Sequence, residues 1–399
     1  MLGATLVSQA LQSGLLIYAF GLIILPFQAD FGASRQTLMY ATVLLSLFSN
    51  ILSPMIGPLL DRTDIRRLML LGVLLLAAGF AALSQVQATW QVLLIFALLM
   101  PPANLLLGQM TASALMTHWF DARRGRALGL SAIGTSIGGL AMPPLLALLA
   151  DAFGWRGAYA VTGAAILLIG LPVVYGLVVD RPSRVGQEVD GRRRSPVDAP
   201  ANESRWTTAA ILRTPQFWQI GAVIGSVMAV YMAFLSNIVP HATDQGIAPT
   251  RAAGLVSLLA LLSIAGKLAF GQLADRIDLR YTLCAAMALM AVGFALLLTG
   301  DSYAQILSAC LPLGLASGGV LPVWGALVGQ AFGAADYGRA FGLVNPVMMP
   351  FTFIAPPATG WVFDTTGNYD LAFGAFLVAL LLAAVLLLPL RLPARQPDA

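Results

Sequence analysis

The sequence contains few charged residues, a single lysine, and little cysteine or histidine. Charged residues make up 10% of its 399 residues and hydrophobic residues 58%, whereas about 25% of an ordinary soluble domain is charged. This composition excludes a soluble enzyme of this size. Two cysteines and two histidines predict neither a disulfide framework nor a metal site. The net charge of +4 is spread over many short segments, which excludes a nucleic-acid-binding patch.

Long apolar runs fill most of the chain. A membrane-spanning helix needs roughly 20 apolar residues, and twelve such runs follow one another with short polar gaps. The predicted fold class is therefore an all-α membrane protein with twelve transmembrane helices. The predicted spans are 6–27, 38–60, 68–85, 91–116, 127–150, 157–179, 216–240, 252–273, 281–299, 303–331, 340–362 and 371–390.

The basic residues are distributed unevenly among the loops. For a cytoplasmic N-terminus, eighteen of the 22 fall in cytoplasmic loops or the C-terminal tail, and Arg35, Arg156 and Arg251 fall on the other side. Cytoplasmic loops are enriched in Lys and Arg, so we expect a multi-pass protein of a cell inner membrane with both termini in the cytoplasm. The remaining basic residue, Lys267, lies within the eighth span.

The second half of the sequence repeats the first. Shifts of 214 and then 213 residues bring Gly, Pro and charged residues into register. We therefore predict two pseudo-symmetric six-helix bundles, residues 1–179 and 213–399, which suit alternating access around a site near the middle of the membrane. The aligned pairs include Pro26 and Pro240, Asp30 and Asp244, Gly57 and Gly271, Asp61 and Asp275, Arg62 and Arg276, Arg126 and Arg339, and Gly129 and Gly342.

Residues 180–212 form the one long gap between spans. Their proline and charge content predicts a flexible cytoplasmic linker that cannot bury a core. Residues 206–212 are predicted to form a short helix in the membrane interface, because Trp206 is amphipathic and Arg205 and Arg213 flank this stretch.

Two repeated segments carry a family resemblance. Residues 57–67 (GPLLDRTDIRR) and 271–280 (GQLADRIDLR) resemble the signature of loops 2–3 and 8–9 in the major facilitator superfamily. Asp64 and Asp278 stand where that signature usually has glycine. Residues 118–129 (HWFDARRGRALG), followed by 154–156 (GWR), resemble the branch of monocarboxylate transporters and oxalate-formate antiporters. The resemblance implies the twelve-helix major facilitator fold and a transport function.

The repeated acidic and basic residues suggest a gate at the cytoplasmic helix ends. A carboxylate there can cap the positive N-terminal dipole of a helix from the opposite half, and arginines can bridge to it. The superfamily resemblance implies the same role. The alternative is a solvated charge cluster that only sets the topology. The predicted gate residues are Asp61, Arg62, Arg66, Arg126, Asp275, Arg276 and Arg339.

Lys267 is the candidate for substrate recognition. All 18 acidic residues lie in loops or at helix ends, so the expected partner of an intramembrane ammonium group is the anion of the substrate. Lys267 also precedes Gly271 by four residues, the spacing of the cation in helix 8 of the resembled branch. In that branch an acidic residue often lies one turn before the cation, whereas this chain has Ser263 at that position. The alternative is a lysine that snorkels toward the lipid headgroups.

Further polar residues are expected to line the substrate cavity. Asn104 and Thr111 share a face of the fourth predicted helix, and the repeat maps them to Ser317 and Trp324. Tyr231, Asn237 and His241 fall on one side of the seventh. For His241 the alternative is a passive hydrogen-bonding role, and for Tyr231 and Trp324 it is core packing. The predicted substrate-binding residues are Lys267, Ser263, Asn104, Thr111, Tyr231, Asn237, His241, Ser317, Trp324 and Asn345.

These observations predict a secondary active or facilitative transporter of a small organic monoanion, with monocarboxylates as the favoured class. One intramembrane cation favours a monoanion over a dianion. The chain lacks the G-x-x-x-x-G-K-[ST] nucleotide motif, and we expect no enzyme activity and no cofactor. The expected partners are the anion, a co-transported proton or an exchanged anion, and the bilayer, with the chain as a monomer. The alternatives are an efflux transporter for lipophilic compounds on the same fold and a non-transporting membrane sensor.

Overall fold

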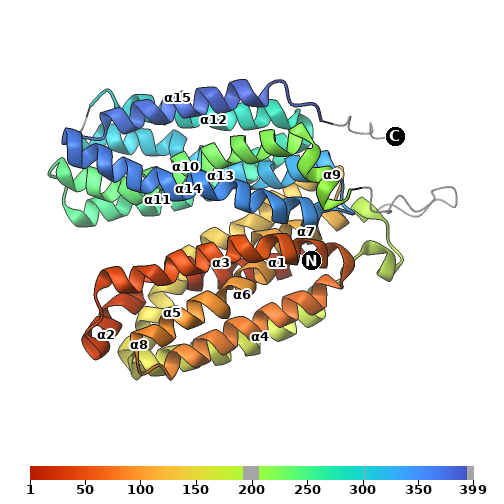
Figure 1. Cartoon of the computed structure of the whole chain (residues 1–399), viewed down its shortest axis with the longest axis horizontal. Helices are drawn as coiled ribbons and strands as arrows, with labels where there is room; N and C mark the ends of the chain where they lie inside the picture. The colour runs from red at the N-terminus through yellow and green to blue at the C-terminus, as the bar shows by residue number, and fades with distance from the viewer. Residues whose placement is uncertain (192–205, 301, 393–399) are drawn as a thin grey trace. The chain divides into compact units, whose positions relative to one another are not determined.

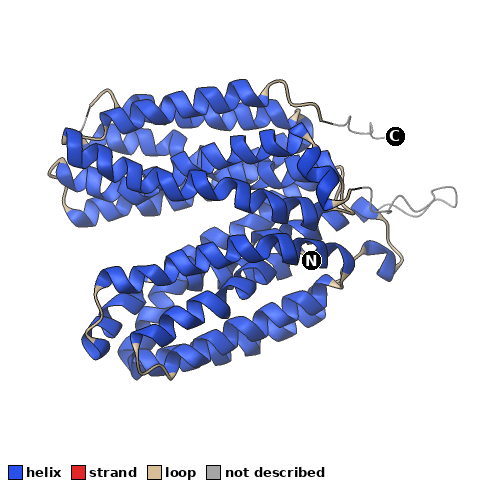
Figure 2. Cartoon of the chain, viewed as in Figure 1, coloured by secondary structure: helices blue, strands red, loops and turns tan. Residues whose placement is uncertain are grey.

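The computed structural model describes residues 1–191, 206–300 and 302–392. Within these ranges the chain consists of helices and connecting loops, without a strand (Figure 2). Figure 1 shows the helices in chain order. They are α1 (Leu2–Ser13), the π-helix η1 (Gly14–Tyr18), α2 (Gly21–Phe31), α3 (Arg35–Arg62), α4 (Ile65–Ser84), α5 (Thr89–Leu98), α6 (Met100–Leu107), α7 (Gln109–Trp119), α8 (Arg124–Leu177), the 3-10 turns η2 (Pro182–Val185) and η3 (Val189–Gly191), α9 (Thr208–Arg213), α10 (Pro215–Asp244), α11 (Pro249–Arg276), α12 (Leu279–Leu297), α13 (Tyr303–Phe332), α14 (Tyr337–Thr366) and α15 (Asp370–Leu387).

The helices agree with twelve passages through a membrane. Within the described ranges, nine helices are long and apolar enough to span a bilayer, with α5 to α7 counted as one. One of these, α8, has 54 residues, or roughly 80 Å of helix, and so provides two passages. The stretch from α1 to α2 and the 30-residue α14 provide the remaining two.

A glycine divides α8 where the sequence predicts the loop between the fifth and sixth spans. Gly154 has φ 67° and ψ 167°, a backbone conformation that favours glycine because it has no Cβ atom. Residues 124–153 and 155–177 therefore run as separate helices without a loop between them. The glycine in the resembled segment 154–156 thus has a structural role.

The fourth predicted span, 91–116, is interrupted twice. It consists of α5, α6 and α7, with breaks at Leu99 and at Gly108. Pro101 and Pro102 follow the first break, where proline fits the first turn of a new helix. Gly108 is extended, with φ −84° and ψ −161°. The breaks leave polar side chains and backbone carbonyls close together inside an otherwise apolar passage.

Local capping explains several helix starts. The Ser34 side chain accepts a hydrogen bond from the backbone N–H of Thr37 (3.1 Å) at the start of α3. At the start of α13, Ser302 accepts from the N–H of Gln305 (3.3 Å), and the Gln305 side chain accepts from the N–H of Ser302 (3.2 Å). Such reciprocal pairs satisfy backbone donors that have no partner within the helix.

The chain divides into two compact units. Unit 1 contains residues 1–121, 130–203 and 334–343, and unit 2 contains residues 122–129, 204–333 and 344–399. Each unit thus includes a short segment from the other half of the sequence: 334–343, with the start of α14, in unit 1, and 122–129, with the start of α8, in unit 2. The predicted boundaries at 179 and 213 stay a prediction.

Each unit has its own helix packing. In unit 1, α4 packs against α6, and α3 packs against α5 and α6. In unit 2, α13 lies between α11 and α12, and α15 packs against α10 and α12. Ring contacts add to the apolar packing, including Phe27 with Trp155 (centroids 4.7 Å apart) in unit 1 and Phe234 with Phe294 (5.6 Å) in unit 2.

The beginning of the predicted linker is folded, which differs from the expected flexible segment. Asp180 is 5% exposed, and η2 and η3 follow it. Its carboxylate is surrounded by donors, which explains how a charged residue becomes buried. The predicted short helix is present as α9, which starts at Thr208 instead of residue 206 because the Thr207 side chain caps it. Its place in the membrane interface stays a prediction. Arg205 lies outside the described residues.

Candidate functional site

Lys267 is buried in the middle of α11. Only 3% of the residue is exposed, and Ser263, one turn earlier on the same face, is 8% exposed. The sequence prediction of a cation inside a membrane span therefore corresponds to an enclosed side chain in unit 2. A snorkelling lysine would keep its ammonium group in water, which does not agree with this burial.

Glycines of two other helices contact the turn that carries Lys267. A methyl group at Gly129 of α8 would collide with the carbonyl oxygen of Lys267, and one at Gly318 of α13 would lie 2.8 Å from the backbone nitrogen of Lys267. The backbones of α8, α11 and α13 therefore approach closely at this position. Ser317, next to Gly318, is 6% exposed and donates a hydrogen bond to the carbonyl oxygen of Gly314 (2.8 Å).

In unit 1, Asn104 belongs to a hydrogen-bonded chain of polar side chains. Gln12 Nε2 of α1 donates to Asn104 Oδ1 (2.5 Å), and Asn104 Nδ2 donates to Ser49 Oγ of α3 (3.1 Å). Gln9, one turn before Gln12, donates to the carbonyl and side-chain oxygens of Ser131 (2.9 and 2.7 Å). The sequence analysis missed both glutamines, although their i, i+3 spacing in a predicted span was a usable signal.

The predicted companion of Asn104 has a structural contact. Thr111 is completely buried and donates its hydroxyl hydrogen bond to the carbonyl oxygen of Leu105 (2.8 Å) across the break at Gly108. This bond satisfies a carbonyl that the interrupted helix leaves without its regular N–H donor. Thr111 therefore stabilises the break that places Asn104 beside Gln12.

Asn237 and His241 of α10 lie against the start of α15. His241 is 3% exposed, and its ring packs edge-on against Tyr369 (5.4 Å) and Phe373 (5.2 Å). The Tyr369 hydroxyl donates to Asn237 Oδ1 (3.5 Å). The structure thus groups these two predicted residues around an aromatic cluster, while the Lys267 turn is in α11.

The remaining predicted lining residues lie on three helices of unit 2. Tyr231 of α10 and Asn345 of α14 are partly exposed. Trp324 of α13 is 6% exposed. Their assignment to the substrate site stays a prediction.

Asp61, at the end of α3, caps the start of α14 within unit 1. Its Oδ1 accepts a hydrogen bond from the backbone N–H of Gly338 (2.7 Å), and its Oδ2 accepts from that of Arg339 (2.8 Å). Both are N–H groups of the first turn of α14, where the helix dipole favours negative charge. Gly57 allows the approach, because a methyl group there would collide with the carbonyl oxygen of Gly338.

Asp275, at the end of α11, makes the equivalent contacts in unit 2. Its Oδ1 accepts from the N–H of Gly125 (2.6 Å) and its Oδ2 from that of Arg126 (3.0 Å), in the first turn of α8. The Arg126 guanidinium Nε lies 3.8 Å from Asp275 Oδ2. The internal repeat is therefore present as a repeated hydrogen-bond geometry, in which a carboxylate at one helix end caps another helix.

The arginines of the predicted gate differ in what they contact. The Arg339 guanidinium pairs with the Asp336 carboxylate (3.1 Å), and the backbone N–H of Arg339 donates to Asp61. Arg66 donates from Nε to the carbonyl oxygen of Val178 (2.5 Å). Arg62 and Arg276 are exposed. The Arg126 guanidinium thus lies beside its capping carboxylate, while the guanidinium groups of Arg66 and Arg339 also contact Val178 and Asp336, respectively.

The two acidic residues that replace glycine in the superfamily signature are helix N-caps. Asp64 Oδ1 accepts from the N–H of Arg66 (3.0 Å) at the start of α4, and Asp278 Oδ1 accepts from that of Arg280 (2.8 Å) at the start of α12. A carboxylate at this position satisfies an otherwise unpaired backbone donor. The departure from the signature therefore replaces a flexible turn with a capped one.

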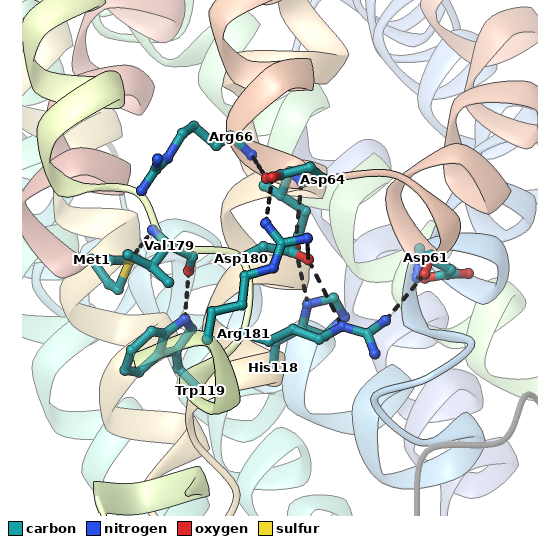
Figure 3. Close-up of polar contacts among 12 residues, drawn as sticks. Met1, Asp61, Asp64, Arg66, His118, Trp119, Val179, Asp180 and Arg181 are labelled. Carbon is teal, nitrogen blue, oxygen red and sulfur yellow. Dashed lines mark hydrogen bonds and ion pairs between the residues drawn. The ribbon is translucent and has the colours of Figure 1, made fainter. Parts of the chain in front are cut away.

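A cluster that the sequence analysis did not predict lies beside Asp61 (Figure 3). His118 Nδ1 is 3.8 Å from Asp180 Oδ1, and both residues are buried. Arg181 Nε is 3.8 Å from Asp180 Oδ2, and its guanidinium donates to the carbonyl oxygen of Asp61 (3.4 Å). The first residues after α8 thus connect α7 to the end of α3.

Further bonds fix the same segment. Trp119 Nε1 donates to the carbonyl oxygen of Val179 (2.7 Å), and the N–H of Ile65 donates to Asp180 Oδ1 (3.4 Å). Arg184 pairs with Asp64. Burial alone would raise the pKa of Asp64, but the hydrogen bonds from Arg184 and from the Arg66 N–H outweigh it and lower the pKa below 3.8.

Comparison with known proteins identifies the family. The family model described as Major Facilitator Superfamily matches residues 6–348 and 232–399. The chain belongs to this superfamily. The chain is therefore a multi-pass membrane protein of this superfamily, which confirms the predicted fold class and the superfamily resemblance.

Named relatives agree with the predicted branch of the superfamily. This member is 26% identical to Monocarboxylate transporter 12 from Rattus norvegicus over 69% of its own length and 61% of the relative. It is 26% identical to Monocarboxylate transporter 3 from the same organism over 86% and 70%. The chain thus spans about three fifths of the length of the first of these relatives.

Solved structures share its fold. The major facilitator transporter FucP in the outward conformation superimposes with a TM-score of 0.73 at 14% identity, covering 96% of this superfamily member and 97% of FucP. The human organic anion transporter MFSD10 (TETRAN) gives 0.72 at 16% identity, covering 96% and 98%.

Proposed function

We propose that this transporter moves a small organic monoanion, with monocarboxylates as the preferred class, and that Lys267 pairs with the carboxylate of the substrate. The observation that carries the proposal is the burial of Lys267, which is 3% exposed in the middle of α11. A lysine at the centre of a membrane span costs at least about 2.5 kcal/mol, and intramembrane charges of this kind generally serve function. The relatives named monocarboxylate transporters support the same substrate class.

The surroundings of Lys267 suit a small carboxylate. Ser263 lies one turn earlier on the same face, and Ser317 lies on the adjoining helix α13. The Ser263 hydroxyl can donate to the second carboxylate oxygen while the ammonium group pairs with the first, and Ser317 can donate once it releases the carbonyl oxygen of Gly314. One cation with neutral donors favours a single negative charge. A dicarboxylate would leave its second charge without a counterion, which is unfavourable inside a membrane.

The remaining predicted substrate-binding residues have a supporting role in this proposal. Asn104, Thr111 and Ser317 would offer hydrogen-bonding groups, and Trp324 would bound the cavity. Tyr231, Asn237, His241 and Asn345 would lie along the access route. Coupling would use a co-transported proton or an exchanged anion, and the chain would act as a monomer.

We propose that transport proceeds by alternating access, with the capping carboxylates as the cytoplasmic gate. Asp61 holds segment 334–343 in unit 1, and Asp275 holds segment 122–129 in unit 2. Each segment continues into a helix of the other unit. Release of these caps would therefore allow the two bundles, 1–179 and 213–399, to move, with the linker 180–212 joining them. Both termini would be cytoplasmic. The proposed gate residues are Asp61, Arg62, Arg66, Arg126, Asp275, Arg276 and Arg339.

Counterflow in proteoliposomes tests the proposal. The full chain is reconstituted with an unlabelled carboxylate inside and a panel of labelled mono- and dicarboxylates outside. We expect uptake of a monocarboxylate by the wild type, a loss of at least tenfold in Lys267→Gln, and partial retention in Lys267→Arg, which keeps the charge. Arg67→Gln, at an exposed position of unit 1, is the matched control for charge removal and should transport normally.

Four outcomes would contradict the proposal. Full activity of Lys267→Gln would remove the role of the ammonium group. A preference for dicarboxylates would exclude the monoanion. Protection of cells from lipophilic compounds that survives in Lys267→Gln would favour the efflux alternative, because an apolar cargo does not require a cation. Absence of any transport with the whole panel would favour a sensor.

A further inference from the structure

A cavity of about 310 Å³ lies in unit 2, at the end where α9 meets the start of α10. Four stretches of chain line it: Trp206 before α9, Thr214 and Gln216 at the start of α10, the end of α13 at Phe332, and Arg391 after α15. The proposed transport function assigns no role to this cavity, and it contains none of the predicted substrate-binding or gate residues.

The cavity wall combines apolar surface with one cation. Trp206 packs edge-on against Phe332 (centroids 5.5 Å apart), and Phe332 is 4% exposed. Leu392 adds further apolar surface. Arg391 is exposed and brings a guanidinium group to the opening. A guanidinium group binds phosphate oxygens through paired hydrogen bonds, and Trp is the residue that membrane interfaces favour most for its combined apolar and polar character.

Arg213 adds a second basic residue near the cavity, because it directly precedes Thr214. The Arg280 guanidinium donates to the carbonyl oxygen of Leu390 (3.0 Å), next to Arg391, but its charge is paired with Asp278 (2.7 Å). Along the helices that leave the cavity, Trp218 of α10 and Leu388 after α15 are each 51% exposed. Because α10 and α15 are long and apolar enough to span a membrane, these exposed side chains at their ends are accessible to lipid.

We propose that this cavity binds the phosphate headgroup of an anionic phospholipid. Arg391 pairs with the phosphate, Trp206 and Phe332 contact the glycerol region, and the acyl chains run along Trp218 and Leu388. The predicted topology places this end of unit 2 on the cytoplasmic side, where basic pockets beside membrane helices meet anionic lipid headgroups.

Native mass spectrometry of the full-length protein in detergent tests the proposal. The protein is titrated with phosphatidylglycerol, with zwitterionic phosphatidylethanolamine, and with inorganic phosphate alone. We expect phosphatidylglycerol to bind more tightly than phosphatidylethanolamine. Arg391→Gln should weaken phosphatidylglycerol binding about fivefold, the usual effect of one basic residue near a membrane surface. Ala331→Phe, which fills the cavity from α13, should weaken it as well, whereas Arg67→Gln should leave it unchanged.

Two results would overturn the proposal. Equal phosphatidylglycerol binding by the wild type and Arg391→Gln would show that the cavity does not hold the headgroup. Arg391-dependent binding of inorganic phosphate that phosphatidylglycerol does not displace would assign the cavity to a soluble anion. Arg391 is exposed, so its substitution preserves the packing and decides the question even if Ala331→Phe fails to fold.

Discussion

Lys267 occupies in unit 2 the position that Ser53 occupies in unit 1. The 214-residue shift that aligns Gly57 with Gly271 also aligns these two residues. The backbone of each residue packs against a glycine near the start of another helix. A methyl group at Gly342 would collide with the carbonyl oxygen of Ser53, and a methyl group at Gly129 would collide with the carbonyl oxygen of Lys267. The two units thus repeat the backbone packing at this position but differ in the side chain, which is serine in unit 1 and lysine in unit 2.

The difference gives a matched substitution for the proposed substrate site. Ser53 is completely buried and donates to the carbonyl oxygen of Gly342 (2.8 Å), so a serine fits this backbone environment. We expect Lys267→Ser to fold and to lose monoanion counterflow at least tenfold, because the ammonium group is gone while a hydrogen-bonding group remains. Uptake in proteoliposomes and the melting temperature in detergent are the measurements. A fully active Lys267→Ser variant would contradict the role of the charge.

The capping carboxylates give a second prediction. Asp61→Asn and Asp275→Asn each retain one acceptor oxygen and turn an NH₂ group toward a backbone N–H. We expect each to lower the free energy of unfolding by about 1–2 kcal/mol, from the loss of one hydrogen bond and of the favourable interaction with the helix dipole. Unfolding in detergent measures this. Asp151→Asn, at an exposed position, is the control and should change stability little; equal effects in all three variants would refute the capping role.

The close approach of α3 to the start of α14 gives a third prediction. Gly57→Ala places a methyl group against the carbonyl oxygen of Gly338, and such overpacking typically costs about 1–3 kcal/mol. Gly360→Ala is the control within α14, because nothing lies within 4 Å of the added methyl group. It should be neutral or stabilising by up to about 1 kcal/mol. Thermal unfolding of both variants compares them, and a neutral Gly57→Ala would show that the helices are farther apart.

Hydropathy and the internal repeat predict much of this architecture. The apolar runs place the membrane spans, and the register of Asp61 with Asp275 predicts that a carboxylate caps a helix in each half. What the repeat cannot supply is the identity of the capped residues, Gly338 and Gly125, which depends on tertiary packing.

Other features depend on contacts that one sequence does not reveal. Gln12 and Asn104 are 92 residues apart, and neither residue type indicates its partner. His118 and Asp180 likewise meet only because α7 and the end of α8 reach the same place in unit 1. The folded start of the linker was missed for a related reason: a charged, proline-containing segment is ordered here by donors from other helices, Trp119 and Ile65, and composition takes no account of them.

The ion pair of Asp64 with Arg184 predicts a pH dependence of stability. Burial acts to raise the pKa of Asp64, but the bonds from Arg184 and Arg66 lower it overall. A carboxyl group with a lowered pKa in the folded state stabilises the protein above its unfolded pKa, and the stabilisation is lost as the pH falls through the folded pKa. Arg184→Gln should therefore lower the melting temperature at pH 6, and this effect should become smaller as the pH falls to 3 and below, because protonation of Asp64 removes the negative partner of Arg184. Melting curves of wild type and variant between these pH values test this, with Arg67→Gln as the charge control. A constant difference across the range would show that Arg184 acts through packing and not through the carboxylate.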